Sequence, residues 1–253
     1  MTTAVQYQRE GDLARITLNR PHRHNALVPE LLDGLRAAVA HCLRDQPAAL
    51  ILDAEGRSFS TGGDVGGFYD TPRAERHDYA ARVVGTLNAV ILDLLSLPLP
   101  TVVAVHGMVT GGSAGLVLAC DIAVAGPKAS FAPWYTAVGY SPDGGWTALM
   151  PERIGRARAL DIQLTNRRVD AEEAHRLGLV QYLTEEGHLA DRTRTVAEAL
   201  RAAKPGSVRH TLALTRPDLD IVAAGLDAEY RHFLEQIVSD EADQGMATFL
   251  NKL

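Results

Sequence analysis

One acidic side chain, Asp143, stands between a proline and two glycines in residues 139–146, whose sequence is GYSPDGGW. Pro-Asp-Gly is ordinary turn chemistry, because proline fixes φ, aspartate hydrogen-bonds to its own backbone and glycine accepts a positive φ. A carboxyl group presented by such a turn also serves as a general acid or base when a substrate lies beside it. The segment alone leaves both interpretations open, a turn residue and a catalytic group.

Two glycine-rich loops each follow an apolar run and precede a helical pattern. They are SFSTGGDV at residues 58–65 and HGMVTGGSAGL at residues 106–116. A glycine just before a helix lets a ligand approach the main chain, and the first N–H groups of the helix have no partner inside it. Either loop alone is typical of a close-packed turn, whereas the pair predicts a site where backbone amides face a ligand.

The second loop also fits the G-x-S-x-G pattern of serine hydrolases at residues 111–115, with Ser113 as the candidate nucleophile. In that motif the strand runs directly into the glycine, whereas here residues 106–110 separate the apolar run from it. No His-Gly-Gly segment lies upstream, and nothing singles out Asp170 or His188 as triad partners. The sequence therefore disfavours a serine hydrolase.

The N-terminal part of the chain supplies the first elements that must position these loops. Residues 4–10 and 13–19 flank Gly11 and Asp12 with alternating side chains, which predicts a hairpin with one wet face. Residues 29–46 begin with a proline suited to a first helical turn, and their three-to-four apolar spacing predicts an amphipathic helix. Its buried stripe consists of Leu31, Leu35, Val39 and Cys42.

Short apolar runs predict buried strands of a parallel sheet. They are residues 48–54, 101–107 and 121–126. A helical pattern at residues 79–97 connects the first two, as a parallel crossover requires. From about residue 186 onward the pattern is helical, interrupted at residues 204–206 and 216–217. The sequence therefore predicts a β/α core followed by a mostly helical C-terminal section.

Composition and charge exclude several classes of partner. The chain has 253 residues, a formal net charge of −6 and no long run of Lys or Arg, so nucleic acid is not an expected partner. No apolar run reaches the length of a membrane span, and the first residues lack the pattern of a signal peptide. Cys42 and Cys120 fall in apolar patterns typical of buried thiols in a reducing compartment, which predicts a cytoplasmic protein without a membrane partner.

Five segments, in this order and at these spacings, resemble the crotonase superfamily of enoyl-CoA hydratases and isomerases. They are NRPHRHNAL at 19–27, RSFSTGGDV at 57–65, VAVHGMVTGGSAGLVLACDIAVA at 103–125, GYSPDGGW at 139–146 and RRVDAEEAHRLGLV at 167–180. The resemblance extends over nearly the whole chain. It implies an α/β fold, a crotonase-like spiral of β-β-α units with a helical C-terminal trimerisation region.

The resemblance also implies how the chain is organised and what it binds. Residues 1–190 would form the crotonase-like β/α core with the acyl-CoA site, and residues 191–253 a helical region for oligomerisation and for covering CoA. The expected partners are an acyl-CoA thioester and further copies of the chain, in a homotrimer or a dimer of trimers. Coenzyme A would be part of the substrate, so no separate cofactor is implied. The histidines show no metal-ligand spacing, and this chemistry requires no metal.

Carried over by motif, the backbone amides of Gly63 and Gly112 would form the hole for the thioester oxygen. An enolate concentrates negative charge on that oxygen, and two preorganised N–H donors stabilise the enolate more than the ground-state carbonyl. The positions that resemble CoA contacts are Arg23, Ala26, Arg57 and Lys252.

The departures from the family pattern decide which reaction is expected. Typical hydratases carry two glutamates, at the positions that Gly115 and Tyr135 occupy here. Without them ordinary syn-hydration is disfavoured. Asp143 stands where a hydratase usually has glycine, and a single carboxylate beside an oxyanion hole suits a 1,3-proton shift. The resemblance is closest to isomerases that act on enoyl-CoAs and on ring-opened or epoxidised phenylacetyl-CoA.

Aromatic side chains cluster around Asp143 in the sequence. They are Trp134, Tyr135, Tyr140 and Trp146. Such a cluster is often simply part of a core, but around a catalytic carboxylate it would suit a bulky or ring-bearing acyl group. Of the two roles open to Tyr135, a donor of a hydrogen bond to the substrate and a surface of the pocket, we expect the second.

Two alternatives use the same residues differently. In the aryl-CoA dehalogenases of the superfamily, a hydrolytic class, the aspartate is a nucleophile that attacks the aromatic ring. Those enzymes also use a histidine on the long helix before the third strand, where this chain has Asn88, and His77 comes too early to replace it. A non-catalytic acyl-CoA-binding homologue is the other alternative. The retained glycines and the added Asp143 argue against it.

Overall fold

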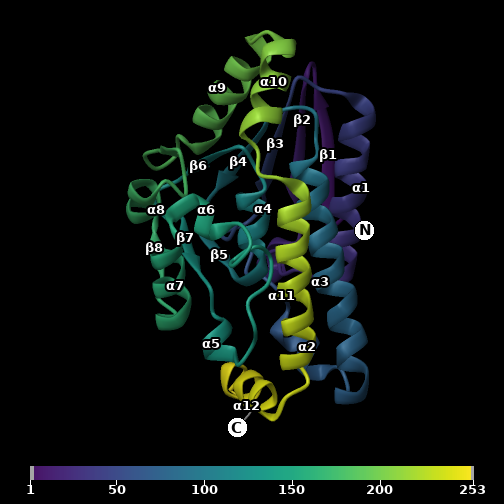
Figure 1. Ribbon diagram of the computed structural model, residues 1–253. Helices are drawn as coiled ribbons and strands as arrows, with labels where there is room; N and C mark the ends of the chain where they lie inside the picture. Colours follow the sequence, from purple (N-terminus) through teal and green to yellow (C-terminus); the bar gives the residue numbers. More distant parts are fainter. Residues whose placement is uncertain (1–2, 252–253) are drawn as a thin grey trace.

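The N-terminal hairpin forms as predicted. The computed structural model describes residues 3–251 (Figure 1). Strand β1 (Val5–Glu10) pairs antiparallel with β2 (Leu13–Leu18), so that Val5 lies opposite Leu18. Strand β2 is buried on both faces, with Thr17 buried and Arg15 half-buried, while β1 stays partly exposed, so the wet face expected on this hairpin is not found on β2.

The main sheet continues from β2 with strands that run parallel to it. They are β3 (Ala49–Ala54), β4 (Thr101–Val105), β6 (Ile122–Ala125) and the short β9 (Tyr182–Leu183). The strand order is β1-β2-β3-β4-β6-β9, and each pair after the hairpin is parallel. The three apolar runs are therefore neighbouring buried strands, as predicted.

A second, three-stranded sheet stands beside the first. Its strands are β5 (Met108–Thr110), β7 (Ser130–Ala132) and β8 (Val169–Asp170), in the order β5-β7-β8. A bridge between Ser60 and Val109 ties the loop after β3 to this sheet. The two glycine-rich loops are thereby brought to one place.

Helices cover both sides of the main sheet: α9 (Leu189–Ala202) packs on one side with a small hydrophobic cluster, and the larger hydrophobic core lies on the other side. Helix α1 (Pro29–Asp45) buries the predicted stripe, and α3 (Arg73–Leu95) is the crossover between β3 and β4. Short helices stand near the loops: α2 (Val65–Asp70), a 3₁₀ turn (Gly111–Ser113) continuing into α4 (Ala114–Leu118), and α5 (Tyr135–Val138). The remaining core elements are a 3₁₀ turn (Pro21–Arg23), α6 (Met150–Ile154), α7 (Arg156–Thr165) and α8 (Ala171–Leu177).

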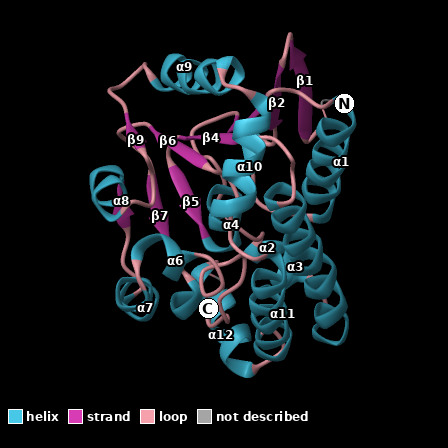
Figure 2. Cartoon of the chain, turned by 45° about the horizontal axis from the view of Figure 1, so that its top comes forward, coloured by secondary structure: helices cyan, strands magenta, loops and turns pink. Residues whose placement is uncertain are grey.

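The C-terminal section is helical, as predicted. It consists of α9 (Leu189–Ala202), α10 (Pro205–Thr215), α11 (Leu219–Gln236) and α12 (Asp240–Phe249). Helix α11 lies alongside α3, and α12 lies across the end of the molecule next to α5 and α2 (Figures 1 and 2). The last two helices therefore return to the glycine-rich loops. The division of the chain at residue 190 stays a prediction.

Arg216 ties the junction of α10 and α11 to the core. Its guanidinium donates to both carboxylate oxygens of Asp121, at 2.8 and 2.7 Å. It also donates to the carbonyls that follow α3, those of Leu95, Leu97 and Leu99. One side chain thus fixes where α11 starts, which matters because α11 reaches the candidate site.

Cys42 and Cys120 are both buried free thiols, as predicted. Burial raises the pKa of each thiol to about 12, so neither behaves as a ready nucleophile. Within residues 3–251, no helix is long and apolar enough to cross a membrane. The cytoplasmic location stays a prediction.

Candidate active site

The two glycine-rich loops lie against each other. Thr110 donates its N–H to the carbonyl of Ser60 at 3.1 Å. Gly62 has a φ of +73°, and a Cβ there would overlap the carbonyl oxygen of Thr110. Only glycine permits this contact, because the left-handed φ and the close backbone both exclude a side chain. The two glycine-rich loops that the sequence indicated therefore form one composite site.

Asp143 is brought to this site by the loop between α5 and α6. A Cβ at Gly112 would lie 2.8 Å from Oδ1 and 3.0 Å from Oδ2 of Asp143. The carboxyl group therefore rests directly on Gly112, the second glycine expected to bind the thioester oxygen. Asp143 is only 7% exposed, although it belongs to a turn. A solvated turn residue would not be buried in this way.

Tyr135 is the hydrogen-bond donor of the site. Its hydroxyl donates to Oδ1 of Asp143 at 2.6 Å and lies 3.0 Å from the Asp143 carbonyl oxygen. This hydrogen bond goes to Asp143 and not to a substrate, and Tyr135 lines the cavity, so the expectation that it is a surface of the pocket stays a prediction. Since Oδ1 is engaged, Oδ2 is the oxygen of Asp143 to which no described residue donates.

The surroundings of Asp143 favour its protonated form. The pKa of its carboxyl is raised from 3.8 to about 7, chiefly by burial and also by the nearby Glu229 carboxylate, while the Tyr135 hydrogen bond opposes both effects. The Tyr135 hydroxyl has a pKa well above 10, because of burial first and the Asp143 charge second. Tyr135 therefore stays a donor, and Asp143 is suited to exchange a proton near neutral pH.

A cavity of about 220 Å³ adjoins Gly63, Gly112 and Asp143. Apart from small residues and a few hydroxyl groups, its lining is apolar and aromatic. The side chains that shape it include Leu27, Val65, Phe68, Val83, Leu87, Val138, Tyr140, Phe233 and Phe249. Among the described residues that line it, Asp143 is the one with an acidic or basic side chain. The cavity is thus an apolar acyl-sized space with a single carboxyl group.

Gly115 shows why a second carboxylate is missing. A Cβ at Gly115 would overlap the carbonyl oxygen of Gly144 and lie 2.5 Å from Cδ1 of Ile91. The turn that carries Asp143 therefore occupies the space that a side chain at position 115 would need. The turn that carries Asp143 and a side chain at position 115 therefore compete for the same space.

Ser113 is not placed as a nucleophile. It is fully buried, and its hydroxyl donates to the carbonyls of Thr110 and Ser60 at 2.7 and 3.0 Å. It also accepts the Thr110 N–H at 3.1 Å, so the hydroxyl stabilises the start of the helix. Ser113 therefore serves to cap the helix, and its match to the serine hydrolase pattern is a coincidence.

Two of the predicted pocket aromatics line the cavity besides Tyr135. Tyr140 packs against Phe68 and Phe233, with ring centroids 5.9 and 5.4 Å apart. Trp134 stands at the mouth, 6.2 Å from the ring of Phe249. Its φ is +62°, an uncommon value for so bulky a residue, and its N–H donates to Asn166.

Trp146 does not line the cavity, contrary to expectation. It is fully buried behind the loop, and its indole N–H donates to the carbonyl of Gly111 at 2.8 Å. The ring meets Tyr135 edge to face, with centroids 6.4 Å apart. Trp146 therefore supports the second glycine-rich loop from behind.

The described residues that were expected near CoA, which are Arg23, Ala26 and Arg57, do not line the cavity that contains Asp143. Arg23 is exposed and pairs with Asp64 at 3.2 Å, and Ala26 is buried. Arg57 lies 3.1 Å from the ring of His24. Lys252 lies outside the described residues. CoA contacts at these positions stay a prediction.

The dehalogenase alternative lacks its histidine in space as well as in sequence. Asn88 donates to the Leu226 carbonyl on α11 at 3.1 Å, and His77 is exposed beside Asp78. Neither residue is among those that line the cavity. Within the described part of the chain, no cluster of three or more His, Cys, Asp or Glu residues could hold a metal ion.

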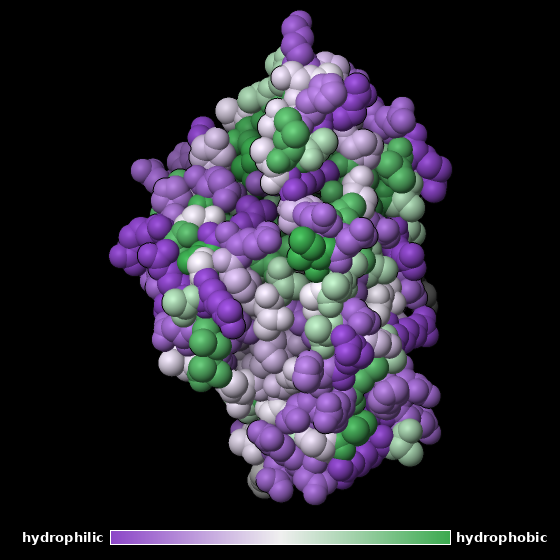
Figure 3. Space-filling view, viewed as in Figure 1, coloured by the Kyte–Doolittle hydropathy of each residue, from purple (hydrophilic) through white to green (hydrophobic). Residues whose placement is uncertain are grey.

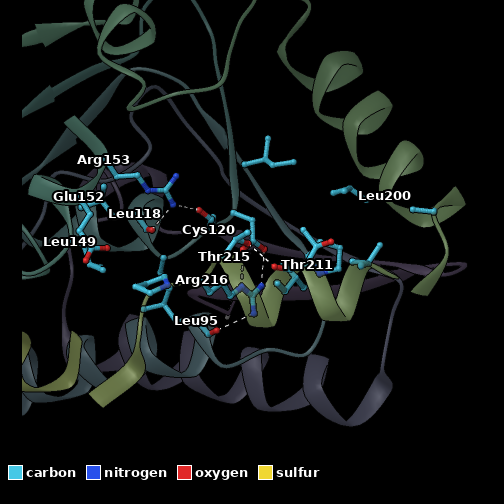
Figure 4. A pocket seen from close by; sticks show the side chains of 18 of the residues that line it. Leu95, Leu118, Cys120, Leu149, Glu152, Arg153, Leu200, Thr211, Thr215 and Arg216 are labelled. Carbon is cyan, nitrogen blue, oxygen red and sulfur yellow. Dashed lines mark hydrogen bonds and ion pairs between the residues drawn. The ribbon is translucent and has the colours of Figure 1, made fainter. Parts of the chain in front are cut away.

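A larger cavity of about 660 Å³ lies between α6, α9 and α10 (Figure 4). The side chains of its two arginines are both engaged by other groups of the protein. Arg153 donates to the carbonyls of Leu118 and Cys120, and Arg216 is bound to Asp121. This cavity contains no glycine loop and none of the predicted catalytic residues, so the smaller cavity is the candidate active site.

Comparison with known proteins gives a consistent family. Residues 8–253 match the family described as enoyl-CoA hydratase/isomerase. The 1,2-epoxyphenylacetyl-CoA isomerase of Escherichia coli is 30% identical over 254 residues, which cover 96% of this chain and 94% of that protein.

Solved structures show the same fold. The enoyl-CoA hydratase of Bacillus halodurans superimposes with a TM-score of 0.90 at 25% identity, covering 97% of this chain and 99% of that chain. An enoyl-CoA hydratase/isomerase of Pseudoalteromonas atlantica superimposes with a TM-score of 0.86 at 30% identity, covering 98% and 97%. The predicted spiral α/β fold is thereby confirmed.

Proposed function

Because this chain belongs to the enoyl-CoA hydratase/isomerase family, we propose that it is an acyl-CoA isomerase, which moves a double bond by a 1,3-proton transfer. One observation carries the proposal: Asp143 is the lone acidic or basic side chain among the described residues of an apolar cavity, and it rests on the oxyanion glycine Gly112. Hydration would require a polar position for water and a second acid/base, and position 115 has no room for one.

The first step is removal of a proton from C2 of a 3-enoyl thioester. The thioester oxygen binds between the amides of Gly63 and Gly112, which stabilise the negative charge that develops there. Oδ2 of Asp143 accepts the proton, because Oδ1 is already bound to Tyr135. The product of this step is a dienolate, and Asp143 is now neutral.

The second step returns the same proton to C4. The dienolate carries negative charge at C4 as well as at C2 and oxygen, so protonation there leaves a conjugated C2–C3 double bond. Asp143 must give up the proton that it has just taken, and a carboxyl pKa of about 7 lets it act in both directions. The apolar lining keeps water from competing for the dienolate.

The acyl group that we propose is ring-bearing or similarly bulky. Aromatic rings of Phe68, Tyr140 and Phe233 pack around the cavity, and Trp134 with Phe249 stands at its mouth. Flat rings pack well against such surfaces. The similarity to an isomerase whose substrate is named as 1,2-epoxyphenylacetyl-CoA supports the same class.

We also propose that the chain forms a homotrimer or a dimer of trimers. Most of the face in Figure 3 is hydrophilic, with separate hydrophobic spots. Highly exposed apolar side chains occur on α7, α10 and α11, namely Leu164, Leu214 and Ile221. Their burial between subunits would supply a contact area. Light scattering should give a trimer or a hexamer, and a monomer would contradict this proposal.

The function is tested with CoA thioesters and an Asp143→Asn variant. Wild type should convert a 3-enoyl-CoA to the conjugated 2-enoyl-CoA without a change of mass in ordinary water. In deuterium oxide, label should enter C2 or C4 in those turnovers in which the proton held by Asp143 exchanges with solvent before it is returned. Asparagine supports the same turn as aspartate, so the variant should bind thioester but lose about 10²-fold or more in kcat. Full activity of the variant would refute the acid/base role.

The same panel separates the alternatives. A gain of water in the product mass would mean hydration, and loss of halide from a 4-halobenzoyl-CoA would mean dehalogenation. In the second case a covalent ester on Asp143 should be trapped in a single turnover. Binding of every thioester without any conversion would favour the non-catalytic homologue.

A further inference from the structure

We propose that Glu229, on helix α11, is the positioning residue of the site: its carboxylate holds the turn that presents Asp143 and places a negative charge beside it. For its effect on turnover the proposal rests on the proposed isomerase function. The effect on the titration of Asp143 does not depend on it. Sequence reasoning missed Glu229, which lies more than eighty residues after the turn.

The contacts of Glu229 are all with the segment that follows Asp143. Oε2 accepts the N–H of Gly145 at 2.7 Å. Oε1 accepts the N–H groups of Thr147 and Ala148 at 2.6 and 2.9 Å and the Thr147 hydroxyl at 2.7 Å. Four donors and no acceptor surround the two oxygens, which is the environment of an ionised carboxylate. Glu229 is only 4% exposed.

The turn held in this way is tightly defined. Gly144 and Gly145 both have positive φ, +61° and +85°. A Cβ at Gly144 would lie 2.5 Å from Cα of Gly112, so the backbone on the C-terminal side of Asp143 touches the oxyanion loop. Glycines alone make a turn flexible, and an external tether is needed to keep it in place. Glu229 supplies that tether from a different part of the fold.

The charge of Glu229 acts on Asp143 directly. From α5, Tyr135 donates to Asp143, and from α11, Glu229 faces it as a like charge. The neighbouring α3 contributes Leu87 beside Gly112, and the loop before the turn contributes the neutral Tyr140. No described lysine, arginine or histidine lines the cavity. Arg76 acts on the Tyr140 hydroxyl from outside the cavity lining, and the Glu229 charge makes ionised Asp143 a stronger base.

The position of Glu229 on α11 is unusual for its residue type. The buried side chains of this helix are Val222, Leu226, Glu229, Phe233 and Leu234. A glutamate in an apolar stripe costs solvation free energy unless it is well bound, and it is retained here through four hydrogen bonds to one turn. This is the signal by which the sequence could have identified it.

The test uses Glu229→Gln, Glu229→Asp and a matched control, Asp227→Asn. Glutamine keeps the length but removes the charge, whereas aspartate keeps the charge but is too short to reach all four donors. Asp227 is an exposed carboxylate on the same helix that pairs only with Arg231. Asp143 is titrated by carbon NMR of its labelled carboxyl group in the substrate-free protein, and kcat and KM are measured separately.

We expect Glu229→Gln to lower the titration midpoint of Asp143 by about 0.5 to 1 unit, because a like charge is gone. Glu229→Asp should leave the midpoint closer to that of wild type but lower kcat about 10-fold or more, because the turn loses its position. KM should change less than about threefold in both variants, and Asp227→Asn should match wild type throughout.

A wild-type midpoint and wild-type kcat in Glu229→Gln would overturn the inference. So would a purely structural effect, in which both variants unfold at lower temperature while the folded protein keeps its midpoint and kcat. If Glu229→Gln does not fold, the kcat of Glu229→Asp still tests whether the position of the turn matters for turnover. Thr147→Val removes one of the four donors and should also lower kcat. If wild type isomerises nothing but the midpoint still shifts, the isomerase proposal fails and the charge effect of Glu229 stands.

Discussion

At the scale of single residues, Asp143 combines two properties that oppose each other. It is buried, which makes its ionised form costly, and in the proposed isomerase mechanism it must ionise to remove a proton from carbon. The Tyr135 hydroxyl offsets part of this cost by donating to one oxygen. Residues selected for chemistry in this way commonly reduce stability, because the fold must tolerate a group that it would otherwise keep neutral or exposed.

Asp143→Asn should therefore stabilise the protein at alkaline pH. The pKa of the acid is raised on folding, from 3.8 to about 7, so the native state binds more protons than the unfolded state between these values. Stability is consequently lost as pH rises through this window, and the penalty is constant above it. Asparagine has no such penalty. We expect its advantage over wild type to grow by about 2–3 kcal/mol between pH 5 and pH 8.

Urea unfolding at several pH values measures this difference, because the unfolding free energy of each protein is obtained at each pH. The comparison across pH matters more than either value alone, since the exchange of side chains also changes packing by a constant amount. A difference that stays flat from pH 5 to pH 8 would show that Asp143 titrates normally in the folded protein.

At the scale of elements, the active site is made by loops that touch through glycines. The turn after Asp143 rests on the start of α4, and Gly115 faces it from the first turn of that helix. Because backbone meets backbone at this point, a single methyl group is enough to force the loops apart. The close approach of the two loops thus leaves no room for a side chain at position 115.

Gly115→Ala tests this contact. Its Cβ would overlap the Gly144 carbonyl oxygen and Cδ1 of Ile91, so we expect a loss of about 1–3 kcal/mol in stability and a fall in kcat as Asp143 is displaced. Gly206→Ala on α10 is the control, because a Cβ there meets nothing within 4 Å. In a helix that change should be neutral or stabilise by up to about 1 kcal/mol.

Thermal unfolding and steady-state kinetics of the two alanine variants decide the matter. Equal behaviour of Gly115→Ala and Gly206→Ala would mean that the turn moves away without cost. Position 115 would then be able to accept the glutamate of a hydratase, and the steric explanation for its absence would be wrong.

At the scale of the whole molecule, the C-terminal helices complete a site that the β/α core begins. Helix α11 brings Glu229 and Phe233 to the Asp143 region, and α12 brings Phe249 to the cavity mouth. Their placement depends on where α11 starts, which Arg216 fixes by binding Asp121 and the end of α3. A substitution that disrupts this distant junction should therefore also disturb the candidate active site.

Arg216→Ala should cost about 3–5 kcal/mol, because Asp121 is left largely buried without its cation. Thioester turnover should fall in the protein that still folds, since α11 loses its anchor. Arg231→Ala is the matched control, as its pair with Asp227 is exposed and worth less than about 0.5 kcal/mol. Chemical denaturation and activity of both variants provide the measurement. Similar values for the two would show that the junction is held by apolar packing instead.

The sequence by itself determined the elements and the main chemistry. The hairpin, the buried strands and helix α1 follow from periodicity, which is a local property of the chain. The glycine loops and Asp143 were found because each motif lies within a dozen residues, and the order of the motifs indicated the family.

Only the tertiary structure decided how the side chains around Asp143 are used. Tyr135 proved to be a donor and Trp146 a support behind Gly111, although both are aromatic neighbours of Asp143 in the sequence. The distinction depends on the directions that α5 and the turn take in space. Glu229 is bound to a residue 84 positions away, and no local pattern encodes such a pairing. Periodicity reports which side chains are buried, whereas the partner of a buried polar group is set by packing between distant segments.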